Sequence, residues 1–73
     1  MMLIVYALGG RRIELDVDKK DTIEVVKQKI EEEIFIPSNM LLLLHEGEQL
    51  DDDEKTCEDY GMEDESVIYI VNQ

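Results

Sequence analysis

Seventy-three residues, 44% of them apolar and 36% charged, make one small domain, residues 1–73, with room for a single core. No stretch approaches the roughly 20 apolar residues of a membrane span, and the N-terminus lacks the basic leader and cleavage site of a secretory signal. The single cysteine, Cys57, excludes an internal disulfide and a thiolate metal cluster, and its apolar surroundings predict a core position. We therefore expect an intracellular protein, in the cytoplasm or the nucleus.

The net charge of −12 is concentrated in one segment. Residues 46–66 hold eleven acidic side chains against Lys55 alone, which accounts for −10 of that total. Such a field repels nucleic acid and anionic lipid and speeds encounter with basic protein surfaces. We therefore expect a protein partner with a basic rim, and neither nucleic acid nor a membrane. The simpler interpretation, that the acids only favour solubility, stays open.

Alternating apolar residues predict two strands joined by a tight turn. Residues 3–8 are apolar at both parities, which is typical of a strand that is covered on both faces or covered by a partner. Gly9-Gly10 ends this strand. Apolar and charged residues then alternate over residues 12–18, which predicts a half-buried second strand and a hairpin.

A helix is predicted after this hairpin. The side-chain oxygens of Asp21 and Thr22 can accept hydrogen bonds from the free N–H groups of a helix that starts at about Ile23. Pro37 disfavours helical geometry in the residue before it, so the helix ends near residues 34–36. Apolar residues at helical spacing form one stripe for the sheet: Ile23, Val26, Ile30 and Ile34.

Two further strands are predicted in the rest of the chain. Residues 41–45 are apolar and bounded by turn residues, and residues 46–48 form a turn before the short extended Gln49-Leu50. The acidic loop, residues 51–55, then leads into residues 56–61, a turn or a short helix. A last strand covers residues 67–71, and no linker or repeat intervenes.

The order of these elements and the residues within them resemble ubiquitin across the whole chain. The matching turn residues are the Ile36-Pro37 pair, Gly47, Gln49-Leu50 and Asp59-Tyr60. The positions where ubiquitin buries an aliphatic side chain are also filled: Leu3, Val5, Ile13, Leu15, Val17, Ile23, Val26, Ile30, Leu43, Leu50, Cys57, Met62, Ile68 and Ile70.

The resemblance implies an α+β fold, the ubiquitin-like β-grasp. In that fold a mixed five-strand sheet packs on one α-helix, and a short helical turn precedes the last strand. The first and last strands pair at the centre of the sheet, and the strand of residues 41–45 lies beside the last one. A register of core and turn positions is more specific than any single motif, although it does not by itself assign a function.

A binding surface follows from the number of layers. One helix can cover only one face of the sheet, so strands that are apolar at both parities must leave apolar side chains in water. In ubiquitin the corresponding face is the main docking surface. We expect an apolar patch of six residues to bind the partner: Tyr6, Leu8, Leu42, Leu44, Tyr69 and Val71. The competing interpretation is that Leu42 and Leu44 lie under a loop.

The sequence departs from ubiquitin around this patch and at the C-terminus. Leu42, Glu48 and Asn72 stand where ubiquitin has basic residues, and Tyr69 replaces a histidine. General ubiquitin receptors should therefore bind poorly, and a partner with a basic rim should fit better. The chain stops at residues 71–73 without the Gly-Gly tail of the family's modifiers, so we expect that as it stands it is not conjugated.

Two further expectations concern the helix. Phe35 occupies the position of a glycine in ubiquitin, where a left-handed helix cap would be strained, so we expect this corner to be rebuilt. Lys27 is interpreted as the structural ion-pair partner of Asp52 or Asp53.

The sequence offers no recognisable catalytic arrangement. His45 is the only histidine, and Ser38 and Ser66 are the only serines. A catalytic pair of His45 with Cys57 would require exposure of a core position. The acidic run of residues 51–54 lacks the alternating ligands and the glycine of a calcium loop. We therefore expect no enzyme, no cofactor and no metal.

These observations predict a non-catalytic protein–protein interaction module that docks an apolar anchor of its partner. Ubiquitin-like domains of proteasome shuttle factors also lack Gly-Gly, so the resemblance implies the proteasome or another ubiquitin-pathway component as a candidate partner. Two alternatives stay open. One is a ubiquitin-like modifier whose tail lies beyond Gln73, and the other is a structural subunit that self-associates through the apolar patch.

Overall fold

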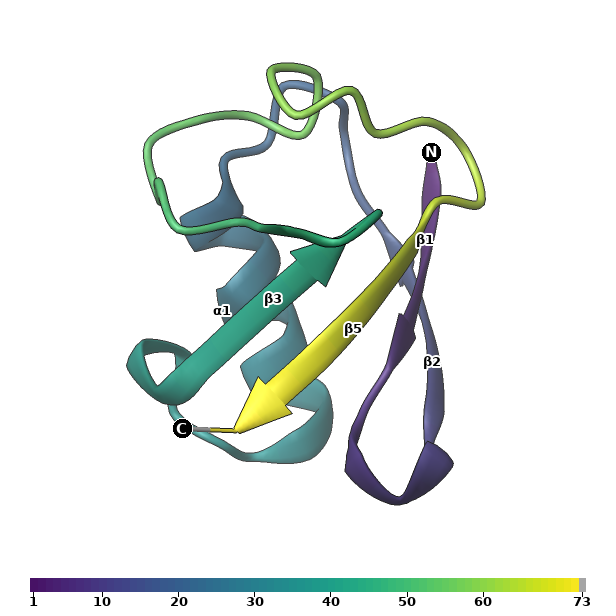
Figure 1. Ribbon diagram of the computed structural model, residues 1–73, viewed down its shortest axis with the longest axis vertical. Helices are drawn as coiled ribbons and strands as arrows, with labels where there is room; N and C mark the ends of the chain where they lie inside the picture. Colours follow the sequence, from purple (N-terminus) through teal and green to yellow (C-terminus); the bar gives the residue numbers. More distant parts are fainter. Residues whose placement is uncertain (73) are drawn as a thin grey trace.

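The computed structural model describes residues 1–72, and their strands form a sheet that packs on one side of a helix (Figure 1). The strands are β1 (Met2–Tyr6), β2 (Arg12–Asp16), β3 (Leu41–His45), β4 (Glu48–Gln49) and β5 (Val67–Asn72). The helix α1 spans Ile23–Ile34, and two short 3₁₀ turns, η1 (Leu8–Gly10) and η2 (Ser38–Met40), lie in the connections.

The sheet has the strand order β2-β1-β5-β3-β4. Its central strands β1 and β5 are parallel, while β1 pairs antiparallel with β2 and β5 pairs antiparallel with β3. A mixed five-strand sheet on one helix confirms the predicted α+β fold. The predicted helical turn before β5 forms as hydrogen-bonded turns over residues 57–61, in which the Met62 N–H donates to the Cys57 carbonyl at 3.0 Å.

The first strand is shorter than predicted. It ends at Tyr6, and Leu8 lies in η1 instead of the strand. Gly9 and Gly10 adopt φ values of 80° and 81°, a left-handed conformation that turns the chain without steric cost. The Ala7 N–H donates to the Arg11 carbonyl at 2.8 Å and closes the hairpin above this turn.

The core lies between the sheet and α1, and it contains every residue predicted for it. All fourteen predicted positions are buried, and Leu41 joins them. In β3 burial alternates, with Leu41, Leu43 and His45 turned inward and the leucines between them half-buried. His45 is 5% exposed, so the only histidine of the chain is a residue of the domain interior.

The acidic loop covers the start of α1. Thr22 Oγ1 accepts from the Val25 N–H at 3.3 Å, which confirms the predicted helix start at Ile23. The two N–H groups before that of Val25, those of Ile23 and Glu24, have no partner within the helix. They donate to the carbonyls of Lys55 and Asp53 at 2.9 and 3.2 Å. Lys27 Nζ lies 2.9 Å from Asp53 Oδ1, so the predicted ion pair is confirmed.

The prediction of a rebuilt corner after the helix is wrong. Phe35 keeps the left-handed cap, with φ 61° and ψ 29°, and its N–H donates to the Glu31 carbonyl at 2.8 Å. Pro37 disfavours helical geometry at Ile36, so the helix has to end at this point. The hydrogen bond of the left-handed cap compensates for the backbone strain of a residue that carries a Cβ atom. The Phe35 side chain is 85% exposed and gains little from burial.

We expect Phe35→Gly to stabilise the domain by about 1 kcal/mol, because glycine adopts the left-handed conformation without strain. Thermal unfolding followed by circular dichroism should show a rise in Tm of about 4–8 °C for a domain of this size. Phe35→Ala retains the Cβ atom and serves as the matched control, with little or no gain. An equal gain in both variants would contradict strain as the cause.

Candidate functional site

The strand register brings outward-facing apolar side chains together on the sheet face opposite α1, which we call the open face. In Figure 1, β3 and β5 lie in front of α1 and present this face to the viewer. Tyr6 stands opposite Tyr69 in β5, and Tyr69 stands opposite Leu44 in β3. Leu42 stands opposite Val71, so five of the six residues of the apolar patch lie on adjacent positions of three neighbouring strands.

The two tyrosines form the centre of the apolar patch. Their rings stack with centroids 5.7 Å apart and an interplanar angle of 22°. Tyr69 is 54% exposed, while Tyr6, Leu42, Leu44 and Val71 are half-buried. Neither Leu42 nor Leu44 is therefore fully covered, as the competing interpretation of a covering loop would require.

Leu8, the sixth predicted residue, lies at the hairpin tip, off the strands that carry the other five. It is 60% exposed in η1, which packs against β5. An apolar cavity of about 130 Å³ adjoins it. The residues that line this cavity are Ala7, Leu8, Arg11, Ile34, Ile36 and Ile70.

Sequence reasoning missed two members of the open face. Ile4 and Val67 are Cα partners across β1 and β5, and both are half-buried. Ile4 has the parity of Tyr6, and Val67 has the parity of Tyr69, so strand alternation alone could have identified them. They continue the apolar surface away from the hairpin tip.

The edges of the open face are not basic. On β2, Arg12 stands opposite Tyr6 and forms an ion pair with Glu14, whose carboxylate raises the pKa of the guanidinium. On the other edge, the polar residue opposite Leu44 is the exposed Gln49, and the exposed Glu48 precedes it. The side chain of Asn72, the third altered rim position, lies outside the described part of the chain.

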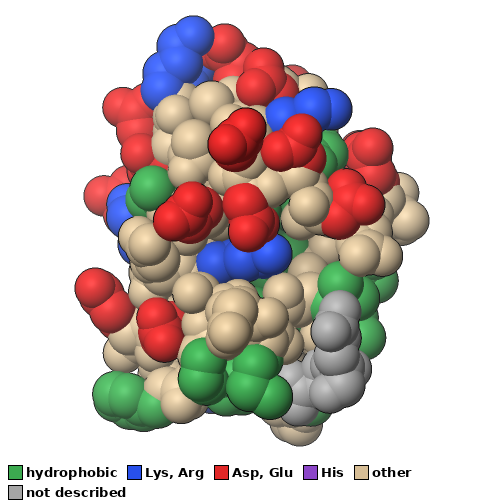
Figure 2. All heavy atoms as spheres, turned by 90° about the vertical axis from the view of Figure 1, so that its left-hand side faces the viewer, with side chains coloured by type: hydrophobic (Ala, Val, Ile, Leu, Met, Phe, Trp, Pro, Cys, Tyr) green, Lys and Arg blue, Asp and Glu red, His purple; other side chains and the backbone are tan. Residues whose placement is uncertain are grey.

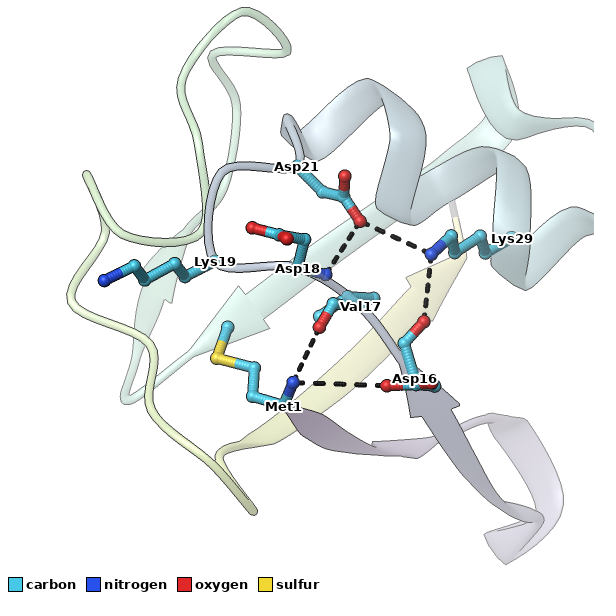
Figure 3. A pocket seen from close by; sticks show the side chains of 7 residues that line it. All are labelled: Met1, Asp16, Val17, Asp18, Lys19, Asp21 and Lys29. Carbon is cyan, nitrogen blue, oxygen red and sulfur yellow. Dashed lines mark hydrogen bonds and ion pairs between the residues drawn. The ribbon is translucent and has the colours of Figure 1, made fainter.

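A larger hollow, of about 670 Å³, lies beside the N-terminus and away from the open face (Figure 3). The residues that line it are Met1, Asp16, Val17, Asp18, Lys19, Asp21 and Lys29. The Met1 ammonium donates to the Val17 carbonyl at 2.8 Å, and Lys29 Nζ lies 3.3 Å from Asp21 Oδ2. Three carboxylates face three cations here, so the charges balance, and we interpret the hollow as structural.

Other chemistry finds no support among the described residues. Burial raises the pKa of the Cys57 thiol, which disfavours the reactive thiolate. Residues 1–72 contain no group of three or more histidine, cysteine or acidic side chains arranged to hold a metal ion. Within the same described range, no helix is long and apolar enough to cross a membrane.

The sequence was compared with protein families and with known proteins. The model of the Ubiquitin family matches residues 3–72. Ubiquitin-like protein 1 of Schizosaccharomyces pombe is 38% identical over 71 residues, which cover 97% of this chain and 90% of that protein. Ubiquitin-like protein NEDD8 of Dictyostelium discoideum is 37% identical over 71 residues, with 97% and 91% coverage. Ubiquitin-like protein 4A of Anoplopoma fimbria is 30% identical over 71 residues, with 97% and 45% coverage.

We expect acid to remove the contribution of Asp21 to stability. The Asp18 N–H and then Lys29 hold the pKa of the Asp21 carboxyl below its ordinary value. A lowered folded-state pKa stabilises the fold above the unfolded pKa of about 3.9, and this stabilisation disappears as the pH falls through the folded pKa. At pH 7, Asp21→Asn should therefore be less stable than wild type by about 1 kcal/mol.

This difference should shrink progressively below about pH 4. Urea unfolding at a series of pH values measures it. Asp51→Asn, a change at an exposed carboxylate of the acidic loop, is the matched control and should alter the curve less. A stability difference for Asp21→Asn that stays constant with pH would contradict the assignment.

Proposed function

Because the chain belongs to the ubiquitin family, we propose that it is a non-catalytic interaction module that docks partner proteins through the apolar patch. The observation that carries the proposal is the continuity of apolar side chains across β1, β5 and β3, with the stacked Tyr6 and Tyr69 at their centre. Isolated exposed apolar residues are ordinary, whereas a contiguous group on rigid strands is typical of a binding surface.

The energy available from this surface suits a regulated interaction. Complete burial of an aliphatic or aromatic side chain contributes about 1.5–3 kcal/mol, so six partly exposed side chains offer up to roughly 10 kcal/mol before association costs. Leu8 and Tyr69, the most exposed of the six, supply much of the area. Tyrosine at the centre of an interface commonly contributes more binding energy than its neighbours. Micromolar or tighter binding is therefore within reach.

Charge indicates which partners this surface accepts. The exposed Glu48 lies on β4, the edge strand that pairs with β3, and Arg12 is already paired with Glu14. A receptor that surrounds its apolar anchor with acidic side chains would meet repulsion, while a basic rim would be attracted. Within the proposal, the partner is a component of the ubiquitin pathway, the proteasome included, that carries such a rim.

Leu44→Glu tests the docking surface. A carboxylate at the centre of an apolar interface loses hydration without compensation, so we expect partner binding to weaken by at least about tenfold. The measurement is an affinity capture from cell extract, quantified by mass spectrometry and followed by titration of the purified partner. Gln28→Glu adds the same charge on the exposed side of α1 and should retain binding.

Circular dichroism must first show that both variants are folded. A folded Leu44→Glu protein that keeps the wild-type partners and affinities would refute the docking role. Sedimentation of the wild type at two concentrations distinguishes self-association, since a dimer lost in Leu44→Glu would assign the apolar patch to a second copy.

The coverage of the relatives favours a second candidate function. The chain covers 90% of Ubiquitin-like protein 1 and 91% of the Dictyostelium NEDD8, so similarity extends over nearly the whole of two short ubiquitin-like proteins. Under this alternative the protein is a modifier, and its natural reading frame continues past Gln73 to a Gly-Gly terminus. The 45% coverage of Ubiquitin-like protein 4A is the pattern expected of a domain in a longer protein.

The coding sequence downstream of Gln73 separates the two. A modifier predicts Gly-Gly within a few residues, and the corresponding protein should form a thioester with an activating enzyme in the presence of ATP. A linker followed by another domain contradicts the modifier and leaves the interaction module as the function.

A further inference from the structure

The end of α1 departs from three local preferences in one place. Its last turn carries Glu31, Glu32 and Glu33 and no basic residue, although the C-terminal end of a helix favours cations. Phe35 then occupies a left-handed conformation that favours glycine. Phe35 is also 85% exposed, and Met40 at the end of η2 is 53% exposed. We call these five residues the helix-end corner.

The helix-end corner is separate from the apolar patch. Among the described residues, four large apolar side chains are exposed. Leu8 and Tyr69 belong to the apolar patch, whereas Phe35 and Met40 do not. Phe35 caps the end of α1 and Met40 ends η2, and α1 and η2 pack against each other. Figure 2 shows the domain from the left-hand side of Figure 1, with groups of apolar side chains at its lower end and acidic side chains above them.

The fold does not depend on the Phe35 ring. The helix end is held by the backbone hydrogen bond from Phe35 to Glu31 and by Arg11, whose guanidinium donates to the Glu33 carbonyl at 3.2 Å. The neighbouring Ile34 and Ile36 provide the contacts with the core. A strained and exposed aromatic residue without a structural task indicates a functional constraint.

We propose that the helix-end corner is a second docking surface, which binds a basic peptide segment of a partner protein through an apolar anchor. Phe35 offers a rigid aromatic surface, and Met40 adapts its shape to the anchor. The inference does not rest on the proposed role of the apolar patch, because the two surfaces share no residue.

The charge of the helix-end corner favours a basic peptide as its ligand over a second copy of the chain. The corner carries three carboxylates against the nearby Arg11, a local charge of −2. The lysines of α1 do not offset it, since Lys27 pairs with Asp53 and Lys29 with Asp21. A second chain of net charge −12 would be repelled, whereas lysine and arginine side chains around an apolar anchor would be attracted.

The test uses a synthetic amphipathic helical peptide of leucine and lysine as the probe, with a matched peptide of leucine and glutamate as the negative control. Chemical shifts of the ¹⁵N-labelled protein, recorded during titration, locate the contact. We expect the leucine–lysine peptide to shift the amides of residues 31–40 most strongly. The leucine–glutamate peptide should shift none of them.

Variants separate the apolar and the charged contribution. Phe35→Gly should weaken peptide binding by about tenfold, although the same change stabilises the fold, so loss of structure cannot explain the result. Changing Glu31, Glu32 and Glu33 together to glutamine should weaken binding and reduce its salt dependence. Changing the exposed Glu46, Glu54 and Glu63 together to glutamine alters the net charge by the same amount at other places on the surface. This control variant should retain most of the affinity for the peptide.

Four results would overturn the proposal. The peptide could shift chiefly the open face or the acidic loop, or Phe35→Gly could bind it as tightly as wild type. Equal weakening by the two glutamine triples would mean that net charge alone attracts the peptide. A concentration-dependent dimer that Phe35→Gly abolishes would show that a second copy occupies the helix-end corner.

Discussion

One helix must cover a sheet of five strands, and this constraint determines where the apolar side chains of the domain lie. α1 buries Ile23, Val26 and Ile30 against one face of the sheet. The central strands β1 and β5 are apolar at both parities, so their second set of side chains has no intramolecular cover. The open face therefore results from a two-layer architecture combined with strands of a type that is normally enclosed on both sides.

The acidic surface is compatible with a stable fold because much of its charge is held locally. Carboxylates accept from backbone N–H groups in the loops, as Asp59 does from Thr56 at 3.0 Å, a hydrogen bond that lowers the pKa of Asp59. Lys20 similarly lowers the pKa of Glu58. The ion pair of Lys27 with Asp53 holds the acidic loop over the start of α1, and the remaining carboxylates of the loop still give it a negative field. Under the proposed function, charge contributes more to the choice of partner than to the packing of the core.

Alternation and helical spacing predicted which residues of the strands and of α1 share a face. The resemblance to ubiquitin identified the buried face and added Leu50 and Met62, which lie outside these elements. Alternation also placed Tyr6, Leu42, Leu44, Tyr69 and Val71 on one face, because register depends on the same parity. The end of β1 and the cap at Phe35 were beyond this reasoning. At both places a local conformational preference competes with hydrogen bonds or turns that form only in the folded domain. Sequence patterns do not show which of the two is stronger.

The rigidity of the open face bears on how well it can bind. Its side chains project from strands whose opposite faces are buried in the core, and Leu3, Val5, Leu43 and Ile68 are fully enclosed there. Their registers are fixed, since a slip by one residue would exchange the buried and exposed sets. The stacked tyrosines are therefore ordered before a partner arrives, and little conformational entropy remains to be lost on association. In the proposed docking role, a surface of modest area can then bind with useful affinity, because its geometry is already set by the residues that stabilise the fold.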